Sequence, residues 1–280
     1  MILLRPRRRG ARILLWGSVI CLMVLLCAAC MRHFVREPSG FFGVPHTQPA
    51  PRPPFTATPD KPYPLQSAPP YTVALDAGHG GYDSGAVGLM REVELCEKTV
   101  DALFVLLAAD PNYTPVRTRE NGVDLSTDDR AQAATEQRAS LLLSVHGNYD
   151  ADTRQSHGFE CFPAPPGRPY AEESLRFAKN LTAGMQAAGH RLRGENGVRF
   201  LYYTNGGHSK KLVESSDMRI REQKSFGMVE KPHCPAVLAE QCFISNYNDM
   251  EAWASPEGCA KAARIYYKAI CTYFDTQPLD

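Results

Sequence analysis

The sequence predicts an α/β domain whose mostly parallel or mixed central sheet is flanked by helices. Short apolar runs alternate with longer stretches of helical periodicity from residue 71 to about residue 274. This order is typical of strands joined by crossover helices. The 280 residues are 44% hydrophobic and 22% charged, which is enough for one sizeable globular domain plus an additional segment.

Each predicted element has a local signal, because strands are short apolar runs and helices are longer periodic stretches. Strands are expected at residues 71–76, 113–118, 140–146, 158–162 and 236–243, and helices at residues 91–109, 126–138, 170–188 and 256–274. The first helix is expected to end at Asp110-Pro111, since proline cannot continue a helix. The second is expected to begin at Ser126, a residue type that caps free N–H groups.

The first 30 residues are predicted to direct export. Residues 13–30 carry no charge, and at about 1.5 Å per residue they span roughly the hydrocarbon core of a bilayer. The preceding arginines favour a cytoplasmic N-terminus with the rest of the chain outside. Two fates are open: an uncleaved signal anchor, or a signal peptide cut near Ala29. Cys27-Ala-Ala-Cys30 also resembles a bacterial lipobox, with Cys30 as the lipidated residue and Cys27 where leucine is usual.

Residues 31–70 are predicted to form a spacer. Eleven prolines fall between Glu37 and Pro70, among Thr, Ser and Gln and few large apolar residues. Such a segment cannot bury a core and favours an extended, semi-rigid chain. The globular domain is therefore expected over residues 71–280.

Charge and cysteine content narrow the function classes. A net charge of +1 gives no reason to expect nucleic acid as a partner. Outside the N-terminal segment the cysteines are Cys96, Cys161, Cys234, Cys242, Cys259 and Cys271. They contain no CxxC pair, which argues against a zinc ribbon. An exported domain could form disulfides, but the spacing of the cysteines does not indicate which ones would pair.

Three candidate functional residues lie at the ends of predicted strands. His79 lies in the glycine-rich turn after the first strand, His146 ends strand 140–146, and Glu240 closes the run that begins at Pro235. Strand ends in one parallel sheet lie at the same edge, where ligands bind in open α/β folds. A single residue of this kind is often only a hydrogen-bonded structural group, but three at matching strand ends are expected to meet in one cleft.

Helical periodicity selects a fourth candidate in helix 91–109. Glu94 shares its face with other charged residues, a pattern typical of a solvated surface. Glu92 shares its face with Leu95 and Leu103, the side expected to face the sheet. A carboxylate there needs a partner, and a metal ion is a good one. Glu92 is therefore the predicted ligand, with Glu94 as the alternative.

Two imidazoles and one carboxylate form a donor set typical of a catalytic zinc with one position open for water. His79, Glu92 and His146 are predicted to bind one Zn²⁺ per chain. Zinc lowers the pKa of its water toward about 7 and polarises a carbonyl. A second carboxylate takes the water's proton and passes it to a departing amide nitrogen, and Glu240 is predicted for that role.

Four stretches give the sequence a specific resemblance. They are Leu75-Asp-Ala-Gly-His-Gly-Gly-Tyr-Asp-Ser-Gly-Ala86, the helix that carries Glu92, Ser144-Val-His-Gly-Asn148, and Ala239-Glu-Gln-Cys-Phe-Ile-Ser-Asn246. Over residues 71–274 the chain resembles the zinc-dependent N-acetylmuramoyl-L-alanine amidases of bacterial cell walls. The resemblance implies a mixed α/β domain, zinc ligands at His79, Glu92 and His146, a catalytic Glu240 and a structural Arg130. It also implies cleavage of the amide bond between N-acetylmuramic acid and L-alanine of the peptidoglycan stem peptide.

The resemblance implies peptidoglycan as the substrate, and the N-terminal segment is expected to contact the membrane. The protein is then expected at the extracytoplasmic face of the bacterial membrane, signal-anchored or lipid-anchored, or otherwise secreted to the cell wall. Two alternatives are a non-catalytic peptidoglycan-binding or regulatory protein of the same fold, and a zinc peptidase that cuts within the stem peptide. A protein activator, the physiological role, the preferred stem peptide and the oligomeric state stay open.

The sequence departs from the family pattern at several places. Ser84 stands where proline is common, Gly147 where alanine is common, and Cys242 where glycine is usual. Cys242 is expected to be an inert buried thiol, with approach to the zinc or a disulfide with Cys234 as alternatives. Residues 201–225 are longer and more polar than the usual connection, and are either a solvated insertion or a segment that grips substrate or gates the cleft.

The remaining histidines are not expected to bind metal. His33 and His46 precede the globular domain, and His190 and His208 are surrounded by polar residues in the sequence. His157 and His233 lie near predicted strand starts, at the end of the sheet expected to be opposite the site.

Overall fold

The computed structural model describes residues 64–279. The predicted membrane segment and most of the proline-rich spacer lie outside the described residues. Within the described range, no helix combines the length and the apolar character that a membrane crossing requires.

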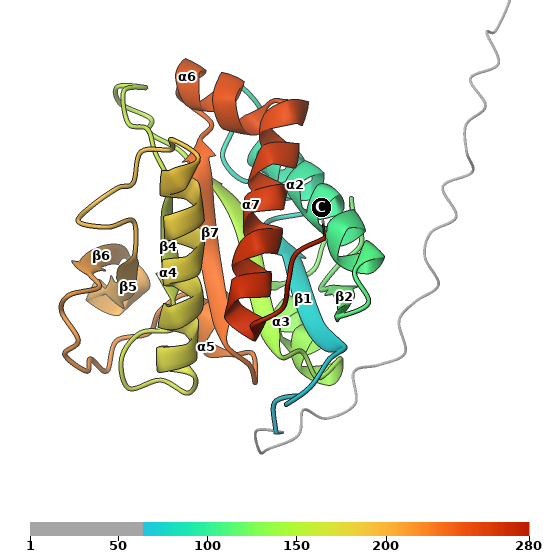
Figure 1. The fold of residues 1–280 in the computed structure, drawn as a ribbon. Helices are drawn as coiled ribbons and strands as arrows, with labels where there is room; N and C mark the ends of the chain where they lie inside the picture. Colours follow the sequence, from blue (N-terminus) through green and yellow to red (C-terminus); the bar gives the residue numbers. More distant parts are fainter. Residues whose placement is uncertain (1–63, 280) are drawn as a thin grey trace, which may run out of the picture. The chain divides into compact units, whose positions relative to one another are not determined.

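A five-stranded sheet forms the centre of the domain, in the order β2-β1-β3-β7-β4 (Figure 1). The strands are β1 (Tyr71–Ala77), β2 (Tyr113–Arg117), β3 (Leu141–Asn148), β4 (Glu160–Pro163) and β7 (Ala236–Phe243). Strands β2, β1, β3 and β7 are parallel, whereas β4 pairs with β7 in antiparallel orientation. The predicted mostly parallel or mixed sheet is therefore confirmed.

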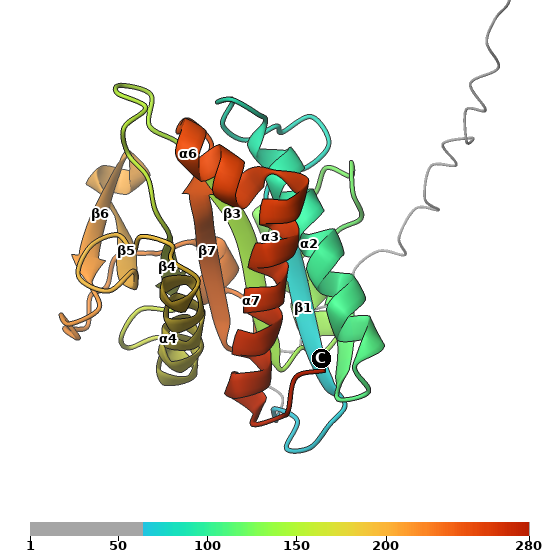
Figure 2. The same cartoon turned by 45° about the horizontal axis from the view of Figure 1, so that its top comes forward.

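Helices cover both faces of this sheet (Figures 1 and 2). Helices α2 (Glu92–Ala109), α4 (Ala171–Ala187) and α7 (Pro256–Phe274) pack on one face, and α3 (Thr127–Glu136) and α5 (Gly227–Glu230) on the other. Two short helices, α6 (Tyr247–Asp249) and η2 (Met250–Ala254), connect β7 to α7. Ser126 caps α3 as predicted, because its side chain accepts a hydrogen bond from the backbone N–H of Asp129.

The strands divide the core into two parts. Side chains alternate between the faces of a sheet, so Val73 and Leu75 of β1 join the larger cluster under α2, α4 and α7. Ala74 joins the smaller cluster under α3 and α5. The same alternation directs Asp76 of β1 and Glu240 of β7 to the α3 side, which is where the cleft described below lies.

A second sheet was not predicted. Strands β5 (Arg199–Thr204) and β6 (Ser209–Glu214) form an antiparallel hairpin closed by the turn η1 (Asn205–Gly207). The hairpin makes up much of residues 201–225, the segment predicted to be either a solvated insertion or a segment that grips substrate or gates the cleft. The missed signal is a β-prone run followed by Asn205-Gly206, a pair that is common in hairpin turns.

All six cysteines within residues 64–279 are free and buried. Cys242 lies in the larger core cluster and Cys234 in the smaller one, on opposite faces of the sheet. The proposed disulfide between them is therefore wrong, and Cys242 is a buried thiol as expected. Burial raises the pKa of the Cys242 thiol well above its ordinary value, which keeps the sulfur uncharged.

Candidate metal centre

His79, Glu92 and His146 converge at the carboxyl edge of the parallel strands. One ligand atom from each lies within 4.8 Å of the others. The Nε2 atom of His79 and the Nδ1 atom of His146 are each 2.9 Å from Oε1 of Glu92. The structure thus brings together the three residues that were predicted from the sequence to be metal ligands.

The turn after β1 sets the orientation of His79. His79 has a φ of 63°. This left-handed backbone conformation is rare for residues other than glycine and is often found at functional sites. Its Nδ1 atom lies 2.9 Å from Oδ2 of Asp83, whose Oδ1 accepts a hydrogen bond from the backbone N–H of Gly85. Asp83 thereby fixes the imidazole so that Nε2 faces Glu92, an arrangement common around metal-binding histidines.

Glu92 is the buried carboxylate at the centre of the group. It begins α2, and its oxygens accept hydrogen bonds from the backbone N–H groups of Ala86 and Gly147 at 3.0 and 3.2 Å. Burial alone would raise the pKa of this carboxyl, but the hydrogen bonds to His146 and His79 outweigh it and lower the pKa. Glu94, the alternative, instead forms a surface ion pair with Arg91.

Glu240 lies beside the group without belonging to it. In the sheet it is opposite His146 of β3 and opposite Glu160 of β4. Its Oε2 atom is buried and has no hydrogen-bond partner among residues 64–279. Burial, followed by the charges of Glu92 and Glu160, raises its pKa to about 8. A carboxyl group with a raised pKa in a cleft is suited to proton transfer near neutral pH.

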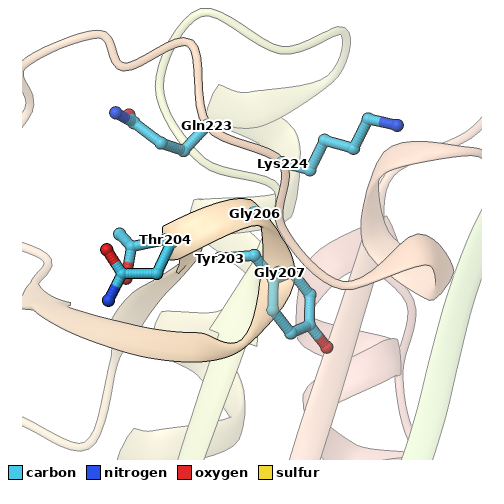
Figure 3. A pocket seen from close by; sticks show the side chains of 7 residues that line it. Tyr203, Thr204, Gly206, Gly207, Gln223 and Lys224 are labelled. Atoms are coloured by element: carbon cyan, nitrogen blue, oxygen red, sulfur yellow. The ribbon is translucent and has the colours of Figure 1, made fainter.

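All four residues line one open cleft of about 420 Å³, together with residues of α3, α5 and the hairpin. A second hollow of about 430 Å³ adjoins it on the β4 side, and Glu240, Lys210 and Phe226 line both. A third hollow of about 800 Å³ lies at the hairpin turn and meets the cleft at Tyr203 (Figure 3). Its lining has no acid, imidazole or thiol, so it does not compete as a catalytic site.

The donor set fits a zinc ion. In a tetrahedral zinc site with bonds of about 2.0–2.1 Å, neighbouring ligand atoms are roughly 3.3 Å apart. The three ligand atoms here lie within 4.8 Å of one another, so small side-chain shifts would bring them to that spacing. The carboxylate of Asp83 contacts the Nδ1 atom of His79, the ring nitrogen that faces away from Glu92, and such a contact commonly orients a metal-binding histidine. Glu240 lines the same cleft and supplies a second carboxylate beside the three donors.

A buried ion pair supports the strands under this group. Asp76 is fully buried and accepts two hydrogen bonds from Nη1 of Arg130 at 2.8 and 2.7 Å. The hydroxyl groups of Ser144 and Thr118 also donate to Asp76, at 2.6 and 2.5 Å. This network joins α3 to β1 and β3 directly before His79 and His146, and these contacts agree with the structural role that the resemblance implied for Arg130.

Sequence reasoning missed a second buried arginine. Arg119 is fully buried and donates to the carbonyl oxygens of Ala77 and Gly78, each at 2.9 Å, and to Glu97 at 2.8 Å. It therefore holds the backbone just before His79. No local pattern identified it, because it acts on a segment about 41 residues away.

One expectation about the other histidines was wrong. Because β4 is antiparallel, its start lies at the edge of the site, so His157 is not at the opposite end. His157 accepts a hydrogen bond from Arg191. His190 is 5% exposed, stacks on Trp253 at 4.1 Å and has its Nε2 atom 2.9 Å from the carbonyl oxygen of Gln241. Neither belongs to the metal group.

Gly78→Ala is expected to lower zinc affinity by about 10- to 100-fold, the range for losing the support of a ligand. A Cβ atom at this position would lie 2.4–2.7 Å from three atoms of the His146 ring, so the imidazole must move. The measurement is a competition titration with a chromophoric chelator. Lys179→Ala, at an exposed position of α4, is the control and is expected to bind zinc like the wild type. Equal affinities in wild type and Gly78→Ala would contradict the assignment of His146.

Comparison with known proteins identifies the family of this chain. A family model described as N-acetylmuramoyl-L-alanine amidase matches residues 73–272. The chain is 27% identical over 209 residues to the uncharacterized protein YqiI of Bacillus subtilis, covering 73% of this chain and 85% of that protein.

The chain is also 27% identical over 228 residues to the N-acetylmuramoyl-L-alanine amidase AmiC of Escherichia coli O6:H1, covering 73% of this chain and 53% of that protein. It thus spans about half the length of AmiC. Among solved structures, the catalytic domain of CwlV from Bacillus (Paenibacillus) polymyxa var. colistinus has a TM-score of 0.59 at 23% identity, with 74% of this chain and 99% of that chain covered. This likeness supports the fold.

Proposed function

This chain belongs to the N-acetylmuramoyl-L-alanine amidase family, and on that premise we propose that it is a zinc-dependent hydrolase of the amide bond between N-acetylmuramic acid and L-alanine of the peptidoglycan stem peptide. The observation that carries the proposal is the convergence of two imidazoles and a carboxylate beside a buried, unpartnered acid in one cleft. His79, Glu92 and His146 would hold the zinc ion. When bound, zinc would supply a Lewis acid for the amide carbonyl and a water of lowered pKa.

Glu240 moves the protons in this proposal. Its carboxylate accepts the proton of the attacking water and delivers it to the amide nitrogen as the C–N bond breaks. The neighbouring Glu160 is fixed by Arg199 at 2.9 Å, by Arg193 at 3.1 Å and by Asn148 at 2.6 Å. Its negative charge favours the protonated form of Glu240, the form that donates to the leaving group.

We also propose where the domain acts. The uncharged residues 13–30 behind a basic N-terminus would anchor it at the extracytoplasmic face of the membrane. The proline-rich stretch within residues 31–70 would then hold the catalytic domain, residues 71–280, at a distance from the bilayer, with Leu65 and Gln66 near its end in contact with the domain.

The proposed reaction is tested by digesting purified peptidoglycan with the full-length protein, with zinc and with a chelator, and by measuring product masses. Free stem peptides that begin with L-alanine, and that appear only with metal, are expected. Cuts within the stem peptide would instead identify a peptidase. Failure to bind zinc would favour a peptidoglycan-binding protein.

The ligand assignment predicts a contrast between two neighbouring glutamates. Glu92→Gln is expected to lower zinc affinity by about 100-fold or more, since losing even a second-sphere group costs about 10- to 100-fold. Glu94→Gln is expected to bind zinc like the wild type, because its side chain pairs with Arg91 outside the cleft. His79→Ala is expected to lose both metal and activity. The measurement is the zinc content of each purified variant by elemental analysis. Full zinc occupancy in His79→Ala would contradict the assignment of His79 as a ligand.

A further inference from the structure

Lys210 brings a cation to the cleft from outside the metal group. It lies on β6 opposite Tyr203 of β5, and it lines both the cleft of the metal group and the hollow toward β4. Its side chain is exposed, and it forms no ion pair with any residue between 64 and 279. A charged group at this position is therefore available to a bound molecule.

The hairpin determines which way Lys210 points. Phe200, Tyr202 and Val213 form a small core on one face of the hairpin and pack against Leu175 of α4. The alternation of strand side chains places Lys210 on the other face, toward the cleft. Lys211, the next residue, lines none of the three hollows.

Aromatic side chains hold the ammonium over the cleft. The Nζ atom of Lys210 lies 5.4 Å from the centroid of the Phe226 ring, within the range of a cation–π contact. Phe226 in turn packs against Phe162 and Tyr203, with ring centroids 5.5 and 6.1 Å apart. In Figure 3 the Tyr203 ring lies on one side of the hairpin turn and the Gln223 and Lys224 side chains on the other.

The charge of Lys210 acts on Glu240 and opposes the rise of its pKa, but no acid among residues 64–279 forms an ion pair with Lys210. Glu160 is bound by two arginines, and Asp150 accepts hydrogen bonds from Thr153 and the backbone of its own loop. Asp152 lines the same hollow, is exposed and forms no ion pair with Lys210 among the described residues. An unpaired ammonium on the wall of a substrate cleft is suited to binding a carboxylate.

We propose that Lys210 binds a carboxylate of the stem peptide and so makes the enzyme prefer peptides with free carboxylates over amidated ones. This inference rests on the proposed function. The chemistry of the substrate shows where its negative charges lie. The carboxyl group of muramic acid forms the scissile amide and is therefore uncharged, and N-acetylated sugars are neutral. The negative charges next to the bond are therefore those of the peptide.

The test uses two synthetic muramoyl peptides of the same sequence, one with free peptide carboxylates and one with those carboxylates amidated. The zinc-loaded enzyme is assayed as wild type, Lys210→Gln, Lys210→Arg and Lys211→Gln. Lys210→Gln is expected to raise KM for the free acid by about ten-fold, as for loss of one hydrogen bond to a charged group, with little change in kcat. It is expected to leave the amidated substrate unaffected. Lys210→Arg is expected to restore much of the affinity, and Lys211→Gln is expected to match the wild type.

Other outcomes overturn the inference in distinguishable ways. An equal loss on both substrates would mean that Lys210 acts through Glu240 and not on the substrate's charge. If Lys210→Gln has wild-type kinetics on both substrates, Lys210 does not bind the substrate, and the proposed amidase reaction is unaffected by this result. If the zinc-loaded wild type cleaves neither substrate, the proposed function fails, and the inference fails with it.

Discussion

Glu240→Gln is expected to lower kcat/KM on a muramoyl peptide by about 10²- to 10⁴-fold, the usual contribution of a general acid–base residue. Glutamine fills the same volume but can neither accept the proton of water nor deliver one to the amide nitrogen. Zinc binding is expected to persist, because Glu240 is not part of the His79, Glu92 and His146 group. The measurement is steady-state kinetics combined with metal analysis of the same preparation.

The matched control is Glu136→Gln, an exposed glutamate at the end of α3, which is expected to keep wild-type activity. Loss of zinc together with activity in Glu240→Gln would show that Glu240 acts as a ligand and not as a proton carrier. Retained activity would remove it from the reaction.

Arg130→Ala is expected to destabilise the domain by about 3–5 kcal/mol, as for a buried ion pair that loses one partner. Asp76 is fully buried, so its charge would remain among apolar strands without a cation. Chemical denaturation followed by circular dichroism measures the change. Arg264→Ala, on the exposed side of α7, is the control and is expected to change stability by about 0.5 kcal/mol or less. A loss of that small size in Arg130→Ala would contradict the role of the pair.

The same pair predicts how stability depends on pH. Burial alone would raise the pKa of Asp76, but Arg130, Ser144 and Thr118 outweigh it and hold the pKa below its ordinary value. A lowered folded-state pKa stabilises the fold above the unfolded value of about 3.9, and this contribution is lost as the pH falls through the folded-state pKa. Asp76→Asn is expected to flatten this acid dependence, measured by denaturation between about pH 2 and pH 6. An unchanged slope would show that other carboxylates cause it.

Several features could be predicted from the sequence because they depend on neighbours along the chain. The alternation of apolar runs with periodic helices predicted every strand of the main sheet and its long helices, and Ser126 marked the start of α3. Helical periodicity also separated Glu92 from Glu94, since residues three and four apart share a face. Strand ends brought His79, His146 and Glu240 to one edge.

Other features were decided by tertiary contacts. The antiparallel direction of β4 leaves no mark in a short apolar run, so the position of His157 was misjudged. The hairpin of β5 and β6 placed Lys210 at the cleft, whereas the polar composition of residues 201–225 did not decide between a solvated insertion and a segment that contacts substrate.

The raised pKa of Glu240 and the paired charge of Asp76 depend on residues far apart in the chain. Asp76 and Arg130 are separated by 54 positions, and Glu240 faces Glu160 only because β4 pairs with β7. The sequence by itself determined which residue types follow which strands, since that is a property of local order. Only the tertiary structure determined their charge states and their reach into the cleft, because burial and Coulomb interactions depend on distance in space.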